Sequence, residues 1–191
     1  MEIKREWKRF VKFMKEDSWQ SLLVSLVLAF IVIKFIIFPV LIALTGTPLP
    51  LVIVESCSMY HHESGFDKTF TSSVYSDYNL SINDTKDWIF RNGFAKGDII
   101  FVVAPKNLKV GDVIIFAGGQ RNPIIHRIIS AGETYTTKGD NYITNKGVGS
   151  FEKTINPSQL LGKAVFRIPY VGWIKLIFFD WRNQASAHGL C

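Results

Sequence analysis

Residues 20–44 read QSLLVSLVLAFIVIKFIIFPVLIAL, and this stretch decides the architecture of the chain. It holds 25 residues and a single charge, Lys34. A helix of this length would be roughly 37 Å long, which is enough to cross a hydrocarbon core about 30 Å thick. A cleavable signal peptide has a shorter apolar region, of about 7–15 residues. The sequence therefore predicts a retained transmembrane anchor over residues 19–45, with a kink at Pro39.

The residues before the anchor predict its orientation. The first 18 residues carry six basic side chains against four acidic ones, and segments rich in Lys and Arg stay in the cytoplasm. Their apolar residues recur at helical spacing, at Ile3, Trp7, Phe10, Val11 and Met14. We therefore expect residues 1–18 to form a cytoplasmic, amphipathic, basic helix on the membrane surface. The chain is then a single-pass integral membrane protein whose remaining residues lie on the extracytoplasmic or lumenal side. Two glycosylation sequons, at Asn79 and Asn83, agree with that side.

The charge distribution and the Cys and His spacing bear on whether the chain binds nucleic acid or metal. The chain has 191 residues and 22 Lys and Arg against 16 Asp and Glu, a net charge of +6. Outside the N-terminal tail these charges are scattered and no stripe of Arg and aromatic residues occurs, so we expect no nucleic-acid partner. The two cysteines provide neither a disulfide scaffold nor a zinc spacing. His61 and His62 are adjacent and lack a third ligand, so we expect exposed polar residues and no metal.

The residues beyond the anchor predict a mainly β domain over residues 46–169. Its apolar runs are short, rich in Val, Ile and Phe, and bounded by Gly, Pro or Asn, which is typical of strands. The expected strands are 51–55, 98–103, 112–116, 124–129, 134–137 and 164–168. Residues 60–94 read as a polar insertion with a short helix near Trp88. Residues 170–191 read as a tail whose first part, 170–181, is too short to span a bilayer and suits a membrane-interface helix.

Three groups in this domain could perform chemistry. Ser56 and Ser58 directly follow the first strand, and a serine nucleophile needs a base and an oxyanion site. His126 lies within an apolar strand, and imidazole is the side chain best suited to take a hydroxyl proton near neutral pH. Asp140 lies in a polar turn, where a carboxylate could orient an imidazole. The order along the chain is serine, histidine, aspartate.

This arrangement resembles type I signal peptidases of the archaeal and endoplasmic-reticulum branch. The similarity covers roughly residues 20 to 175, with the family's blocks in the right order. The matching segments are Ser56-Cys57-Ser58-Met59, Gly97-Asp98, Val110-Gly111-Asp112, Ile125-His126-Arg127, Thr137-Lys138-Gly139-Asp140-Asn141 and Ile168-Pro169-Tyr170-Val171-Gly172.

The resemblance implies a signal-peptidase-like β domain and a role for each residue. Ser58 would be the nucleophile, His126 its general base and Asp140 the group that orients the base. The backbone N–H of Ser58 would stabilise the oxyanion, with the Ser56 hydroxyl as a candidate helper. Apolar side chains around Met59 and the first strand would shape pockets for small residues.

The activity implied by the resemblance is serine endopeptidase cleavage of N-terminal signal peptides from translocated preproteins, with no metal or organic cofactor. The expected partners are secretory preproteins and the lipid bilayer. Whether the chain acts alone, with the translocon or with accessory subunits stays open.

Three alternatives also stay open. Positions where many members of this family carry a further acid hold Asn145 and Lys146, so Glu152 is the alternative third group. Cys57 is intrinsically a better nucleophile than serine, which allows a cysteine hydrolase. A catalytically degenerate, membrane-anchored binding module of the same fold is the alternative to an enzyme. His188 and Cys191 are expected to be inert tail residues.

Overall fold

The computed structural model describes residues 2–61, 66–179 and 191. The chain divides into two compact units, residues 1–44 and residues 45–191. Each unit is described by itself below.

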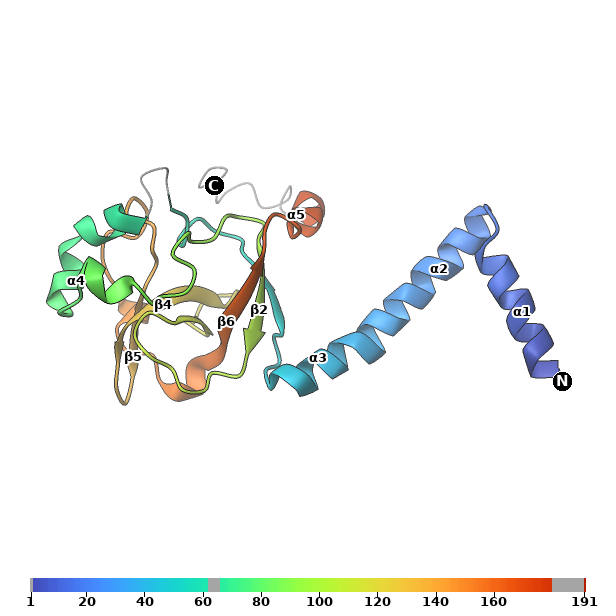
Figure 1. The fold of residues 1–191 in the computed structure, drawn as a ribbon, viewed down its shortest axis with the longest axis horizontal. Coiled ribbons are helices and arrows are strands. Elements are labelled where there is room, and N and C mark those ends of the chain that lie inside the picture. The colour runs from blue at the N-terminus through green and yellow to red at the C-terminus, as the bar shows by residue number, and fades with distance from the viewer. Residues whose placement is uncertain (1, 62–65, 180–190) are drawn as a thin grey trace. The chain divides into compact units, whose positions relative to one another are not determined.

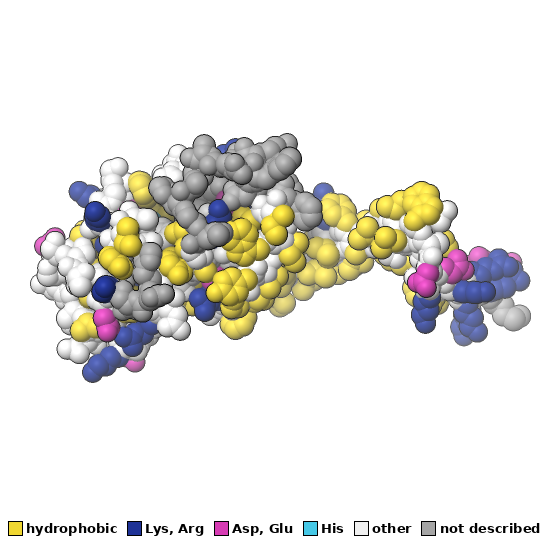
Figure 2. Space-filling view, turned by 90° about the horizontal axis from the view of Figure 1, so that it is seen from above, with side chains coloured by type: hydrophobic (Ala, Val, Ile, Leu, Met, Phe, Trp, Pro, Cys, Tyr) yellow, Lys and Arg dark blue, Asp and Glu magenta, His cyan; other side chains and the backbone are white. Residues whose placement is uncertain are grey.

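The N-terminal unit is helical. Helix α1 spans Glu2–Met14 and α2 spans Trp19–Val32. The Ser18 hydroxyl caps α2 by accepting a hydrogen bond from the Ser21 N–H at 3.2 Å. Figure 2 shows the Lys and Arg side chains gathered on α1 and hydrophobic side chains over the following helix. The amphipathic helix expected at residues 1–18 is therefore present as α1, and its contact with a membrane surface stays a prediction.

The apolar segment continues beyond α2 without interruption. A π-helical turn, η1 (Ile33–Ile37), leads into α3 (Phe38–Thr45). Proline cannot donate a helix hydrogen bond, and the widened turn lies just before Pro39, where the sequence predicts a kink. Trp19–Thr45 is 27 residues long, and none of its most apolar stretch is buried inside the protein. Among the described residues it is the one helix long and apolar enough to cross a membrane.

The C-terminal unit is built on a six-stranded antiparallel sheet with the order β1-β2-β6-β3-β4-β5. Figure 1 shows β6 beside β2. The strands are β1 (Leu51–Ile53), β2 (Ile99–Val103), β3 (Val113–Phe116), β4 (Ile124–Ala131), β5 (Tyr135–Lys138) and β6 (Leu160–Ile168). All six strands predicted from the apolar runs are confirmed, and β6 begins four residues before the predicted start. With its helices, the chain as a whole is a mixed α/β protein.

Period-two alternation divides the core into two clusters on the two faces of the sheet. Val113 and Ile115 of β3 pack in one cluster with Met59 and Phe94. Ile114 and Phe116 belong to the other cluster, which also contains Ile128 and Ile155. Strand β3 is therefore buried on both faces.

Two Gly-Asp pairs form the same kind of turn before β2 and β3. Gly97 and Gly111 both have positive φ, of 90° and 94°, which only glycine adopts at low cost. The following carboxylates each accept a hydrogen bond from the backbone N–H three residues earlier, Asp98 from Ala95 at 2.9 Å and Asp112 from Lys109 at 3.0 Å. These two pairs are structural turns, as their position before strands predicts.

The insertion at residues 60–94 carries short helices and an aromatic interior. It contains η2 (Phe66–Thr71), α4 (Ser73–Asp77) and η3 (Ile82–Thr85). The short helix expected near Trp88 corresponds to η3, which ends three residues earlier. Phe66, Phe70 and Trp88 pack against one another, and the Arg127 guanidinium lies 5.3 Å from the Trp88 ring centre and 5.4 Å from that of Phe66. The aromatic side chains of the insertion thus pack against the Arg127 side chain of β4.

Two further 3-10 turns, η4 (Ser150–Glu152) and η5 (Pro157–Gln159), precede β6. The chain then enters α5 (Trp173–Phe179), the short helix expected from residue 170 onward. Leu176 is buried, whereas Ile174 and Ile177 are exposed. Residues 180–190, including His188, lie outside the described part of the chain.

Candidate active site

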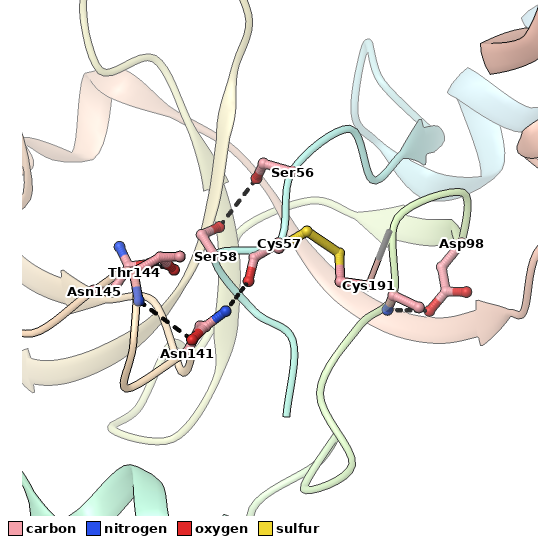
Figure 3. The surroundings of a disulfide bond; sticks show 9 residues. Ser56, Cys57, Ser58, Asp98, Asn141, Thr144, Asn145 and Cys191 are labelled. Carbon is pink, nitrogen blue, oxygen red and sulfur yellow. Dashed lines mark hydrogen bonds between the residues drawn. A yellow bond between two sulfur atoms is a disulfide. The ribbon is translucent and has the colours of Figure 1, made fainter. Parts of the chain in front are cut away.

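The loop that carries the two serines follows β1 and turns back sharply. The Tyr60 N–H donates to the Cys57 carbonyl at 3.0 Å, and the Phe94 N–H donates to the Met59 carbonyl at 2.9 Å. These bonds hold residues 57–60 as a turn against the insertion. The hydroxyls of Ser56 and Ser58 lie 3.2 Å apart, within hydrogen-bond distance (Figure 3).

Met59 lies behind this loop. Its side chain is fully buried in the core cluster, and its sulfur accepts a hydrogen bond from the Asp140 N–H at 3.5 Å. The sequence placed Met59 in a substrate pocket, but the structure places it in the core. The turn directs Met59 into the core cluster that also contains Val54 and Phe94, whereas Ser58 is partly exposed and lines the groove.

His126 lies in the middle of β4 and is paired with a carboxylate. Its Nδ1 is 2.5 Å from Oε1 of Glu152, and the two side chains are 4% and 2% exposed. The second oxygen of Glu152 accepts a hydrogen bond from the Gly149 N–H at 2.7 Å, which fixes the carboxylate. With Nδ1 occupied by Glu152, the imidazole has Nε2 left to act on another group.

Ser58 and His126 come from distant parts of the chain and line one groove of about 640 Å³. The groove is also lined by apolar side chains of β1 and by polar residues at Gln120, Asn122 and Asn145. Among the residues that line the groove, Glu55 accepts a hydrogen bond from Asn122 at 2.8 Å, and its carboxylate lies 3.4 Å from the Lys175 ammonium. The structure therefore brings the expected nucleophile and base to the same surface of the domain.

Asp140 has different partners from those the sequence suggested. It is fully buried, and its carboxylate accepts hydrogen bonds from the Arg127 side chain at 2.7, 3.0 and 3.1 Å. His61 Nε2 lies 3.1 Å from the same carboxylate. Glu152, and not Asp140, is the acid in contact with His126. The expected pairing of Asp140 with His126 is corrected because neighbouring residues in a strand face opposite sides, so Arg127 meets Asp140 while His126 meets Glu152.

The surroundings of Asp140 form a buried charged layer. Burial by itself acts to raise the pKa of Asp140, but the Arg127 charge and the hydrogen bonds from His61 and Arg127 lower it to about 2. Burial lowers the pKa of Lys138, whose ammonium donates to the Gly139 carbonyl at 2.9 Å. Burial also raises the pKa of Tyr75, and the charge of Asp140 acts in the same direction. This layer indicates that Asp140 stabilises the fold behind the groove.

Asp140→Asn is therefore expected to destabilise the protein by about 3–5 kcal/mol, because it leaves the buried Arg127 charge without its counter-ion. Thermal unfolding in detergent measures this loss. Asp87→Asn is the matched control, because Asp87 is an exposed carboxylate whose replacement leaves the unfolding temperature unchanged. An Asp140→Asn protein as stable as the control would contradict the structural role.

The same ion pair predicts an acid dependence. The folded-state pKa of about 2 lies below the ordinary value of 3.8, so the unfolded state binds the proton more tightly. The stabilisation, about 2 kcal/mol, is complete above pH 4 and is lost as the pH falls from about 4 to 2. Unfolding measured across this range should show the loss in the wild type and not in Asp140→Asn.

Cys57 is joined to Cys191 by a disulfide bond (Figure 3). A disulfide sulfur carries no thiolate, so the cysteine-hydrolase alternative is excluded for this state of the protein. The expectation that Cys191 is an inert tail residue is also corrected. The bond attaches the end of the described chain to the residue next to Ser58.

Two other residues escaped the sequence analysis. His61 was expected to be exposed, but its side chain is buried against Asp140, and His62 lies outside the described residues. Asn141 is buried and bonded to the serine loop. For Glu152 the sequence carries no clear signal, because Gly149 at the start of its turn has no side chain to complete a capping box. The Glu152 carboxylate is nevertheless folded back onto the Gly149 N–H.

Comparison of the chain with protein-family models and with curated proteins finds no match.

Proposed function

We propose that the chain is a membrane-anchored serine endopeptidase of the signal-peptidase type, which removes N-terminal signal peptides from translocated preproteins. One observation carries the proposal. Ser58 and His126 line the same groove, and Glu152 occupies the Nδ1 side of His126. A serine–histidine–acid triad needs these three groups, and Glu152 is the acid in contact with the histidine.

The proposed reaction proceeds in two stages. The Ser58 oxygen attacks the scissile carbonyl while its proton passes to Nε2 of His126, and the imidazolium is stabilised by Glu152. The Ser58 N–H stabilises the oxyanion. The carbon–nitrogen bond then breaks as His126 returns the proton to the leaving amine, which gives an acyl-enzyme. Water, activated by His126, releases the signal peptide and regenerates Ser58.

The location proposed for the domain is the extracytoplasmic or lumenal side, with the N-terminus in the cytoplasm. Two independent features support it. The basic residues of α1 precede the apolar helix, and such segments stay cytoplasmic. The domain also contains a disulfide, and disulfides form and persist in oxidising compartments.

Substrate selection is proposed to come from the groove. Leu51, Ile53 and Ile125 line it together with Ser58, and apolar walls admit a small side chain while excluding a large one. A preference for small residues before the cleaved bond therefore needs only packing. The polar rim contributed by Glu55 and Lys175 would contact more distant residues of the preprotein.

The test is cleavage of a preprotein by the purified protein in detergent or lipid, with the cut site read by mass spectrometry. Ser56→Ala and Ser58→Ala form a matched pair, because the two hydroxyls lie 3.2 Å apart on the same groove. We expect the Ser58 variant to lose cleavage altogether and the Ser56 variant to keep measurable cleavage, because the Ser56 hydroxyl is at most a helper to the Ser58 N–H. Binding of preprotein without cleavage by the wild type would reject the enzyme and support the degenerate binding module.

A further inference from the structure

Asn141 contacts the peptide groups on both sides of Ser58. Its side-chain Nδ2 donates to the Cys57 carbonyl at 2.8 Å, as Figure 3 shows, and its backbone N–H donates to the Ser58 carbonyl at 2.9 Å. Asn141 is 2% exposed, so these bonds are shielded from water. One residue thus anchors the two carbonyls that flank the proposed nucleophile.

The other end of the amide is fixed as well. Its Oδ1 accepts hydrogen bonds from the backbone N–H groups of Ile143 at 2.9 Å and Thr144 at 3.3 Å. Rotation of the amide would therefore break bonds at both ends. The turn also lies very close to the loop, since a Cβ at Gly139 would come within 2.6 Å of the Ser58 carbonyl oxygen.

The Cys57 carbonyl belongs to the same peptide group as the Ser58 N–H. In a trans peptide these two bonds point in opposite directions in one plane, so holding the oxygen fixes the direction of the N–H. The oxygen accepts from both Asn141 and Tyr60, and hydrogen bonds to a carbonyl polarise the attached N–H.

We propose that Asn141 is a positioning residue that fixes and polarises the Ser58 N–H as the oxyanion donor. The proposal rests on the endopeptidase function above, in which this N–H meets the developing negative charge. Such a donor acts only in the transition state, so its orientation affects kcat and not substrate affinity.

The kinetic test uses Asn141→Ala, which removes the bond to Cys57 and keeps the backbone bond to Ser58. The matched control is Thr69→Val, because the buried Thr69 hydroxyl donates at 2.9 Å to the Asp140 carbonyl of the same turn and not to the Cys57 carbonyl, which shares its peptide group with the Ser58 N–H. Removing an oxyanion donor costs about 10²–10³-fold in kcat, so misdirecting one should cost about 10–100-fold with KM unchanged. Inhibition by a peptide aldehyde, whose adduct carries an oxyanion, should weaken by the same factor.

Asn141→Asp is the second variant. It keeps the acceptor for the Ile143 and Thr144 N–H groups and places an oxygen against the Cys57 carbonyl, so we expect a loss at least as large. Equal losses of kcat in Asn141→Ala and Thr69→Val, or a rise in KM alone, would overturn the proposal.

A readout without turnover separates this proposal from the function on which it rests. The amide ¹⁵N chemical shift of Ser58 reports the hydrogen bond to the preceding carbonyl and should change in both Asn141 variants but not in Thr69→Val. An unchanged shift would also overturn the positioning role. If the wild type cleaves no preprotein while the shift still depends on Asn141, the endopeptidase function fails and the control of the Ser58 peptide group stands.

Discussion

Replacing His126 by alanine is expected to abolish signal-peptide cleavage, with a fall in kcat of about 10⁶-fold. In serine hydrolases, removing the base lowers kcat about as much as removing all three residues of the triad, because these residues act as one unit. His126 holds this position because β4 places it on the groove shared with Ser58. Cleavage of a purified preprotein, quantified over long incubations, measures the effect.

His126→Ala leaves the buried Glu152 carboxylate without its partner, so a control must separate loss of catalysis from loss of folding. In the double variant His126→Ala/Glu152→Gln a neutral amide replaces the buried carboxylate, so a folding defect in the single variant should be relieved while cleavage stays absent. His126→Lys should not restore activity, because a lysine would extend past the site that the imidazole occupies beside Glu152. Near-normal cleavage by His126→Ala would show that the base is another residue.

Glu152→Gln is expected to lower kcat by about 10⁴-fold while leaving the protein folded. The glutamine carbonyl can still accept from Gly149, and its NH₂ then faces Nδ1 of His126. The imidazole would take the opposite tautomer, with a proton on Nε2, and could no longer accept the proton of Ser58. Steady-state kinetics on the variant, with circular dichroism to check its fold, measures this.

The comparison with Asp140→Asn decides which acid serves the base. Asp140→Asn should lose stability, and at temperatures where it remains folded it should retain substantially more activity than Glu152→Gln. The reverse pattern, with Glu152→Gln active and a folded Asp140→Asn inactive, would return the role to Asp140.

The sheet could be predicted from the sequence because its signals are local. Each strand is a short apolar run bounded by turn residues, and Gly97-Asp98 and Gly111-Asp112 mark two of the turns directly. The start of β6 could not be predicted, because Gly162 interrupts the apolar pattern. A bare backbone is required there, since a Cβ would lie 2.2 Å from Val102 on the neighbouring strand.

The site was predictable in part for a similar reason. Ser58 and His126 lie in segments that resemble known motifs, and the structure places both on one groove. The choice between Asp140 and Glu152 was not predictable, because it depends on which face of β4 each acid approaches. That choice is made by the buried Arg127, whose guanidinium also donates to the Gly111, Ile89 and Phe90 carbonyls and therefore holds Asp140 away from the groove.

The bond between Cys57 and Cys191 has a consequence for the biosynthesis of the protein. The two cysteines are separated by 134 residues, so on the proposed topology the bond cannot close until that whole length has reached the oxidising compartment. In the chain-entropy model, closing a loop of this size raises the free energy of the unfolded state by about 5 kcal/mol. A nascent chain inserted in this way would carry its serine loop without the anchor until Cys191 has crossed the membrane. On the proposed topology, this anchor on the serine loop forms only after both cysteines have reached the oxidising compartment.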